Sequence, residues 1–219
     1  MGTEIQQPDG IAAAKSNETF GDGLRRRAWT IGMFVAVIWI VWLADTIVFH
    51  GWLMQHGVAP RTTRGLVGII WAPFLHASWT HVSSNTIGIL LLGGLLILRN
   101  EAHFWIVSFL GALAGGLGTW LIGRGNSVHA GASGVVFAYF GYLLFAGIFE
   151  RRIVSLLLSL AVFLIWGGML WQILPTQTSV SWEGHVCGLA GGALAAKLLT
   201  KRSTSPQQTS EIVQEQPRL

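Results

Sequence analysis

Charged residues are scarce in this chain of 219 residues. Asp, Glu, Lys and Arg make up 11% of it, whereas a soluble domain carries about a quarter. Hydrophobic residues account for 52%, and the chain holds eleven Trp, a residue that favours the membrane–water boundary. The shortage of charge excludes an ordinary soluble domain and predicts a protein whose solvent is lipid.

Cysteine is nearly absent as well. Cys187 stands alone, which excludes a disulfide within the chain. The sequence also lacks CxxC, any Cys/His zinc spacing and HExxH, so we predict no metal and no cofactor. The net charge of +4 comes from basic residues between apolar runs, which favours membrane topology and argues against a nucleic-acid partner.

Six apolar stretches are long enough, or nearly so, to cross a bilayer, for which a helix needs about 20 residues. The second is a little short, and the sixth is short and rich in glycine. The sequence therefore predicts an all-α membrane protein with a bundle of six transmembrane helices. The expected spans are about 28–49, 82–98, 103–122, 132–149, 153–174 and 184–199.

The distribution of Lys and Arg predicts the orientation of this bundle. With the N-terminus in the cytoplasm, eleven of the fourteen basic residues fall on the inner side. The positive-inside rule favours this arrangement, so we expect both termini to be cytoplasmic. The three basic residues left outside are Arg61, Arg64 and Arg124.

The chain divides into three parts. Residues 1–27 and 201–219 are polar and are predicted to be disordered cytoplasmic segments. Residues 28–200 form the six-helix domain. Its long outer loop, residues 50–81, carries apolar residues such as Trp52, Leu66 and Trp71. A solvated linker does not need them, so we expect the loop to lie in the interface or to dip into the membrane.

The segment Gly131-Ala132-Ser133-Gly134 begins the fourth expected helix. A serine attacks a carbonyl when a base takes its proton, and the free N–H groups of a helix N-terminus can stabilise the developing oxyanion. The alternative is a small-residue contact between helices, which is common in membrane bundles. Taken alone, this segment favours the contact.

The sixth expected helix opens with His185, and glycines follow at every fourth position. Gly184, Gly188 and Gly192 form one smooth face on which another helix can pack closely. That packing would carry His185 towards the neighbouring helix, where it can serve as the general base of a serine. A buried histidine bonded to a backbone carbonyl is an equally good interpretation.

His81 and Asn85 are spaced i, i+4 at the start of the second expected helix, so they share a face. Both donate hydrogen bonds, which suits an oxyanion hole, although both also join helices in bundles. The helices that carry these three segments run in the same direction. Nucleophile, base and oxyanion donors are therefore expected at one depth, as an acyl-transfer site requires.

On these residues the chain resembles the rhomboid family of intramembrane serine proteases, over residues 28–200. The resemblance implies a catalytic dyad of Ser133 and His185, and an oxyanion hole from His81, Asn85 and the N–H of Ser133. It also implies transmembrane protein substrates within the lipid bilayer. The matching residues are His81 and Asn85, Gly131, Ser133 and Gly134, and His185, Gly188 and Gly192.

Two positions depart from the family pattern. Phe137 stands where many members have a Tyr that stacks on the catalytic histidine; it can still stack but offers no hydroxyl. The Trp-Arg pair of the first outer loop is absent, since Trp52 and Arg61 are separated. The fold of the loop therefore stays open, while the chemistry is unaffected.

The acidic residues near the outer side favour a dyad over a triad. Glu183 is two residues from His185 and should point to another face, and Asp45 lies on the first helix. We interpret Asp45 as a boundary residue that reaches for the interface, and Cys187 as a packing residue.

Two other functions remain open. A non-catalytic rhomboid-like protein would bind membrane clients, but it needs neither Ser133 nor His185. A metal or haem transporter would use the outer histidines, among them His50, His56 and His129, yet no two histidines share a helix face at i, i+3 or i, i+4. We expect a multi-pass protein of the bacterial plasma membrane whose site faces outward. The sequence predicts neither the substrate nor the oligomeric state.

Overall fold

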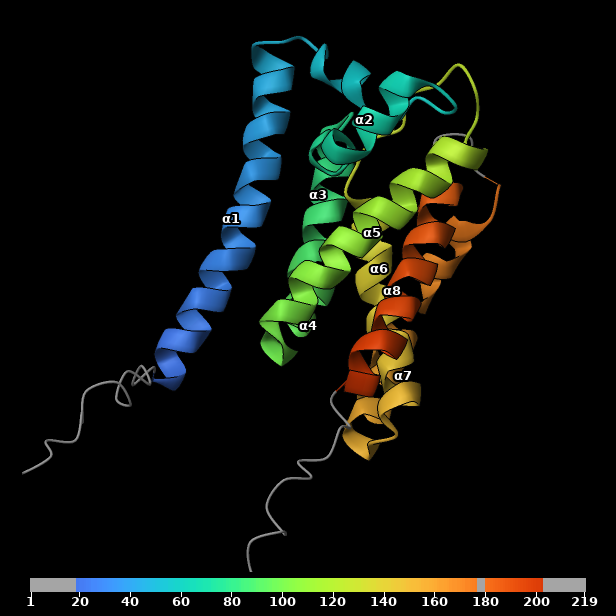
Figure 1. The fold of residues 1–219 in the computed structure, drawn as a ribbon. Helices are drawn as coiled ribbons and strands as arrows, with labels where there is room; N and C mark the ends of the chain where they lie inside the picture. Colours follow the sequence, from blue (N-terminus) through green and yellow to red (C-terminus); the bar gives the residue numbers. More distant parts are fainter. Residues whose placement is uncertain (1–18, 177–179, 203–219) are drawn as a thin grey trace, which may run out of the picture.

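The computed structural model describes residues 19–176 and 180–202, and all the regular elements within them are helical (Figure 1). A single β-bridge in this part of the chain joins Val58 to His129. The α-helices are α1 (Phe20–Ile47), α2 (Thr63–Trp71), α3 (Trp79–Gly88), α4 (Gly94–Arg99), α5 (Glu101–Ile122), α6 (Ser133–Glu150), α7 (Ile153–Trp166) and α8 (Trp182–Arg202). The shorter turns are η1 (Leu53–His56), η2 (Ala72–Phe74), the π-helical η3 (Ile89–Gly93) and η4 (Gly167–Ile173).

Five helical segments are long and apolar enough to cross a membrane. The chain is therefore a multi-pass membrane protein. Its spans are helical because lipid offers no hydrogen-bond partner to backbone N–H and C=O groups, and a helix pairs these groups within itself. Two spans are composite: α3, η3 and α4 form one continuous helix, and η4 extends α7. The five spans are Phe20–Ile47, Trp79–Arg99, Glu101–Ile122, Ser133–Glu150 and Ile153–Ile173.

The expected sixth span is present as a helix, α8, but it is not among these five. It carries Glu183, His185, several glycines and basic residues near its end, which lower its hydropathy. The physical reason is its position beside both α5 and α6 (Figure 1), where much of its surface meets protein and needs fewer apolar side chains. That α8 spans the membrane stays a prediction.

The first helix begins eight residues earlier than expected. Thr19 caps α1 through its hydroxyl, which accepts from the N–H of Asp22, and Asp22 bonds back to Thr19 in a capping box. Residues 20–27, placed by sequence in a disordered arm, are therefore helical. Residues 1–18 and 203–219, which the sequence predicts to be disordered, lie outside the described residues.

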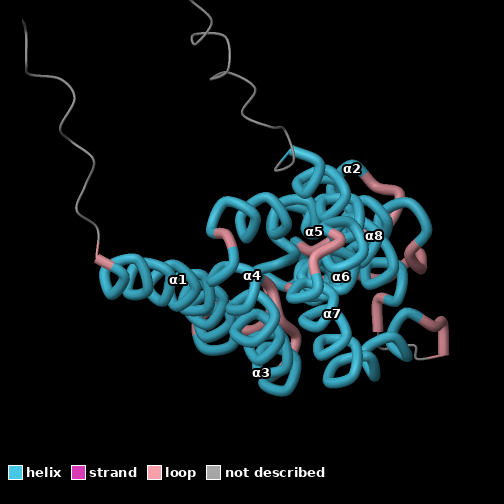
Figure 2. The backbone as a smooth tube through the Cα atoms, turned by 90° about the horizontal axis from the view of Figure 1, so that it is seen from below, coloured by secondary structure: helices cyan, strands magenta, loops and turns pink. Residues whose placement is uncertain are grey.

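Helix α6 stands at the centre of the bundle, with α4, α5, α7 and α8 around it (Figure 2). In α6, 61% of the apolar stretch of 18 residues is buried inside the protein, whereas the corresponding share is 17% in the span of α1 and in that of α7. The outer helices therefore turn most of their apolar side chains towards lipid, while α6 supplies the protein core. Its buried aromatic residues include Phe137, Tyr139 and Phe140.

Glycines allow α6 and α8 to cross at backbone contact. A Cβ built on Gly188 would lie 2.2 Å from the carbonyl oxygen of Gly134, and one on Gly192 would lie 2.0 Å from that of Ala138. A Cβ on Gly141 would meet the carbonyl oxygen of Leu189 at 2.3 Å. No side chain fits there, so the smooth glycine face expected from the sequence sets the distance between the two helices.

The long loop between α1 and α3 is folded rather than extended, and it packs on α5. Val58, Ile69 and Ala72 are buried, and the half-buried Trp120 of α5 packs against them. Arg61 donates to the carbonyl oxygens of Leu121 and Gly123 at the end of α5 (3.1 and 2.8 Å). Arg61 thus anchors the loop without the Trp-Arg pair that the sequence lacks.

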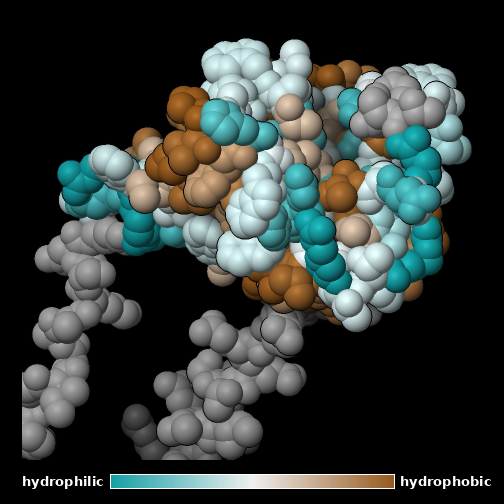
Figure 3. All heavy atoms as spheres, turned by 90° about the horizontal axis from the view of Figure 1, so that it is seen from above, coloured by the Kyte–Doolittle hydropathy of each residue, from teal (hydrophilic) through white to brown (hydrophobic). Residues whose placement is uncertain are grey.

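The outer surface of this loop exposes apolar residues. Trp52, Leu66 and Trp71 are exposed, and the view from the α2 end shows hydrophobic residues beside hydrophilic ones (Figure 3). That the loop lies in the membrane interface stays a prediction, which this amphipathic surface supports.

The helix crossing predicts the effect of one methyl group. Gly192→Ala should lower the free energy of unfolding by about 1–3 kcal/mol or more, because its Cβ meets backbone that cannot give way. Gly94→Ala is the matched control, since a Cβ there meets nothing within 4 Å and should be neutral or stabilising by up to about 1 kcal/mol. Unfolding in mixed micelles measures both, and equal stabilities would contradict the close crossing.

Candidate active site

Ser133 and His185 lie in direct contact where α6 and α8 begin. The hydroxyl of Ser133 donates to Nε2 of His185 at 2.8 Å. His185 is only 4% exposed, so bulk water does not compete for its ring. This is the contact that a serine nucleophile and its general base require.

A backbone carbonyl orients the ring of His185. Nδ1 of His185 lies 3.0 Å from the carbonyl oxygen of Gln172 in η4. A carbonyl oxygen only accepts, so Nδ1 carries the proton and Nε2 is left to accept from Ser133. The carbonyl of Gln172 therefore takes the orienting position that a carboxylate holds in a serine triad.

The ring of Phe137 packs against a face of the His185 ring. The two rings stack with centroids 4.2 Å apart and planes inclined by 14°. Ser133 and Phe137 are one helical turn apart on α6, so the same helix presents the hydroxyl and the stacking surface. The ring of His185 is thus fixed by three contacts: Ser133, Gln172 and Phe137.

Neither Asp45 nor Glu183, the acidic residues near this end of the bundle, bonds to Nδ1 of His185. The carboxylate of Asp45 accepts from the N–H groups of Leu53 and Met54 (2.8 and 3.2 Å) and is buried. It caps η1, so our interpretation of Asp45 as a residue reaching for the interface was wrong. Glu183 is 2% exposed, and its Oε2 bonds to no described residue.

His81 and Asn85 lie against the segment that leads to Ser133. Gly131 has a φ of +121°, and a Cβ there would lie 2.5 Å from Nε2 of His81 and 3.4 Å from Nδ2 of Asn85. Only glycine allows this conformation and this approach without strain. The structure therefore gathers the sequence-predicted residues His81, Asn85 and Gly131 beside the N-terminus of α6.

His76, in the segment just before α3, also belongs to this group of side chains. Its Nε2 accepts from Nδ2 of Asn85 (2.9 Å) and from the N–H of Ala132 (3.4 Å). Its Nδ1 lies 3.3 Å from the carbonyl oxygen of Phe74, to which it donates. His76 thus orients the amide of Asn85 and ties it to the residue before Ser133.

His76 must stay neutral to make these bonds, because both partners of Nε2 are donors. Burial, helped by the neighbouring His81, lowers the pKa of His76 to about 4, and the bond to Phe74 opposes the shift. The rings of His76 and His81 are 5.0 Å apart. Two imidazolium ions at this separation would repel each other.

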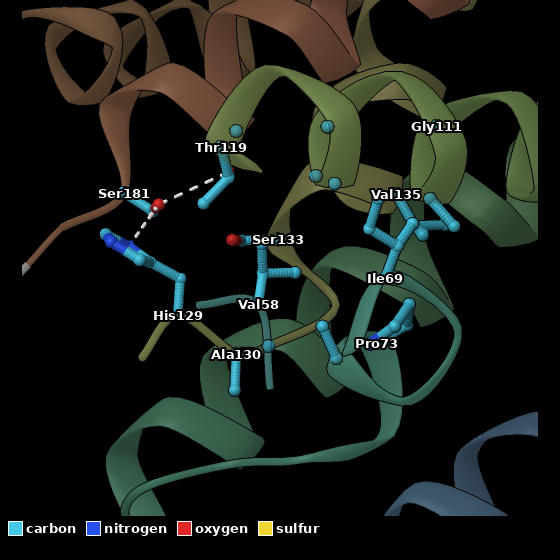
Figure 4. Close-up of a pocket in the computed structure, with 17 residues that line it drawn as sticks. Val58, Ile69, Pro73, Gly111, Thr119, His129, Ala130, Ser133, Val135 and Ser181 are labelled. Carbon is cyan, nitrogen blue, oxygen red and sulfur yellow. Dashed lines mark hydrogen bonds between the residues drawn. The ribbon is translucent and has the colours of Figure 1, made fainter. Parts of the chain in front are cut away.

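A small cavity of about 40 Å³, lined by apolar and by polar side chains, adjoins Ser133 on the side of α5 (Figure 4). The hydroxyl of Ser181 bonds to Nδ1 of His129 (2.7 Å) and contacts the hydroxyl of Thr119 (3.5 Å), and all three side chains line the cavity. The volume is enough for about three water molecules. Ser133 therefore shares a small cavity with two further hydroxyl groups and an imidazole.

Two other outer histidines, His56 and His129, make hydrogen bonds within the protein. His129 bonds through Nε2 to Ser127 (2.8 Å) and through Nδ1 to Ser181. His56 bonds to the carbonyl oxygen of Trp52. Burial lowers the pKa of His129, and the charge of Glu183 opposes that shift. Within residues 19–176 and 180–202, no group of three His, Cys, Asp or Glu is placed to hold a metal ion.

Comparisons with known proteins agree with this geometry. The rhomboid domain family matches residues 63–202. An uncharacterized protein of Mycobacterium tuberculosis is 36% identical over 211 residues, which cover 90% of this chain and 85% of that protein. A Bacillus subtilis protein provisionally named a rhomboid protease is 24% identical over 174 residues, which cover 74% and 84%. The chain belongs to the rhomboid family.

The burial of His76 predicts a loss of stability in mild acid. The unfolded chain takes up a proton at His76 near pH 6.5, while the folded protein resists until about pH 4. The free energy of unfolding should therefore fall as the pH drops from 6.5 to 4, by up to about 3 kcal/mol from this residue, and then level off.

Melting temperatures between pH 7 and pH 4 measure this effect. His76→Gln should flatten the pH dependence, because an amide oxygen accepts the same bonds without titrating. His50→Asn is the control: His50 is exposed and has a positive φ that Asn tolerates. The account of His76 fails if His76→Gln melts with the slope of the wild type.

Proposed function

We propose that this rhomboid-family protein is a serine endopeptidase that cleaves transmembrane segments of other proteins by a dyad of Ser133 and His185. The single observation that carries the proposal is the 2.8 Å hydrogen bond between these side chains at the N-terminus of α6. A structural histidine would need only its bond to a carbonyl. Here the second ring nitrogen, Nε2, also accepts from the hydroxyl of Ser133. Ser133 stands at a helix N-terminus, whose free N–H groups can stabilise an oxyanion.

The reaction follows from the hydrogen bonds. His185 takes the proton of Ser133 at Nε2 while the oxygen of Ser133 attacks the substrate carbonyl. The imidazolium, held by the carbonyl of Gln172, then gives this proton to the leaving amine, and an acyl-enzyme remains on Ser133. Water hydrolyses the ester with His185 again as base, and the small cavity beside Ser133 supplies a place for it.

The oxyanion hole is assigned to the N–H of Ser133 and the side chains of His81 and Asn85. In the free protein, Asn85 uses one amide hydrogen on His76, and the other remains for the substrate oxygen. Gly134 and Gly188 support the site by letting α8 approach, as Gly192 does one turn further on. Preorganised donors of this kind are the largest single contribution in many acyl-transfer enzymes.

The proposed topology has six spans, with α8 as the sixth and both termini in the cytoplasm. Eleven of the fourteen Lys and Arg then lie inside, and Ser133 and His185 open towards the outer side of a bacterial plasma membrane. A reporter that is active only in the cytoplasm, fused after residue 219, checks this orientation, and a silent reporter would contradict it.

The alternative is a rhomboid-like protein that binds membrane clients without cutting them. The M. tuberculosis relative is itself uncharacterized, so kinship does not decide between the two functions. The assembled dyad favours the protease, because a client binder gains nothing from a serine hydroxyl aimed at an imidazole.

Removal of either dyad residue should abolish cleavage. Ser133→Ala and His185→Ala should each lower kcat/KM on a transmembrane model substrate by at least about 10³-fold, because nucleophile and base act as a unit. Cleavage by purified protein in detergent measures this, with Ser127→Ala as a control serine outside the dyad. Equal cleavage by wild type and Ser133→Ala would sink the proposal.

Phe137 should act through the position of His185. Phe137→Ala removes the stacked ring and should lower kcat/KM roughly 2- to 10-fold, in line with about 0.5–1.5 kcal/mol for an aromatic pair. Phe137→Tyr keeps the ring and should stay close to the wild type. A Phe137→Ala variant with unchanged kcat/KM would show that stacking does not position the base.

A further inference from the structure

A second cavity lies at the end of the bundle away from Ser133. Its volume is about 770 Å³, and it opens between the ends of α4, α6, α7 and α8. Helix α6 runs from Ser133 to Glu150, so at 1.5 Å per residue the two sites are about 25 Å apart. The cavity therefore takes no part in the chemistry at Ser133.

One wall of this cavity is an ion pair that is already satisfied. Arg99 pairs with Glu150, and it also donates to the hydroxyl of Ser155 at 3.1 Å. The hydroxyl of Ser155 donates to Glu150 as well. The negative charge of Glu150 is therefore neutralised within the wall and does not repel an anion in the cavity.

Two residues of the remaining polar lining, Arg152 and Asn100, offer hydrogen-bond donors. Arg152 is exposed and forms no ion pair with a described carboxylate, although it lies in the lining. Asn100 accepts from the N–H of His103 at 3.1 Å through its side-chain oxygen, which leaves its amide hydrogens free. These amide hydrogens and the unpaired guanidinium match the oxygens of a phosphate group.

The apolar side of the cavity continues onto the lipid-facing surface of α7. Ile153 and Val154 line the cavity and are each 78% exposed. Leu158, one turn further along α7, also lines it. A small soluble anion would gain nothing from this surface, whereas an acyl chain attached to the phosphate could lie along it.

We propose that this cavity binds an anionic phospholipid, with the phosphate diester held by Arg152 and Asn100 and an acyl chain along Ile153, Val154 and Leu158. The cavity lies at the ends of apolar spans, at the depth where headgroups meet water. Basic pockets between membrane helices at this level are suited to such headgroups. The lipid would join α7 to the ends of α4 and α8.

Native mass spectrometry of the full-length protein in detergent tests the proposal. The protein is given phosphatidylglycerol or phosphatidylcholine at equal concentration. Phosphatidylglycerol should be retained at higher occupancy, and Arg152→Gln should weaken its binding about fivefold, the effect of one basic residue at a lipid headgroup.

Arg151→Gln is the matched control, because Arg151 is the exposed neighbour of Arg152 and does not line the cavity. It loses the same charge and should bind phosphatidylglycerol as the wild type does. Equal losses in the two variants, or equal occupancy by the two lipids, would overturn the site. Displacement of bound phosphatidylglycerol by millimolar inorganic phosphate would show that the cavity binds a free anion, and it would overturn the proposal of a phospholipid.

Discussion

The contact between α6 and α8 is the constraint on which the rest of this structure depends. Gly188 and Gly192 meet the carbonyl oxygens of Gly134 and Ala138 so closely that no Cβ fits between them. In lipid the hydrophobic effect does not drive helices together, so close van der Waals packing must do so. Because α6 begins at Ser133 and α8 carries His185 in its first turn, the same packing brings the hydroxyl to the imidazole.

The site around this contact is built from neutral groups. His185 is oriented by the carbonyl of Gln172, and Asn85 by the neutral ring of His76. A carboxylate in the same place would have to be buried in a protein surrounded by lipid, where an ionised side chain is costly. The carboxylates near this end are held apart from the dyad: Asp45 caps a turn of the loop, and Glu183 does not bond to His185.

Much of this arrangement could be predicted from the sequence, because side-chain type and spacing carry it. The helical class, the approximate spans and the glycine face of Gly184, Gly188 and Gly192 follow from composition and periodicity. The position of Gln172 could not be predicted, since its contribution is a backbone carbonyl that any residue can supply. The role of Asp45 depends on the path of a loop whose fold comes from tertiary contacts of Arg61 and Val58.

The start of α1 was misplaced for a different reason. The segment before Ala28 is polar and contains Arg25, Arg26 and Arg27, which favoured the prediction of an unstructured arm. The same segment contains the capping box of Thr19 and Asp22, which indicates the start of a helix. Hydropathy finds the part of a helix that lies in lipid and misses turns that extend beyond it. The low hydropathy of α8 has another cause: its polar residues are covered by α5 and α6.

The central claim is that Ser133 is a nucleophile activated by His185. The most direct measurement is the mass of the protein, and of its Ser133 peptide, after reaction with a fluorophosphonate at neutral pH. The account predicts one adduct on Ser133 in the wild type and little or none in His185→Ala. An unmodified Ser133 in a folded wild type, or equal labelling in His185→Ala, would contradict it.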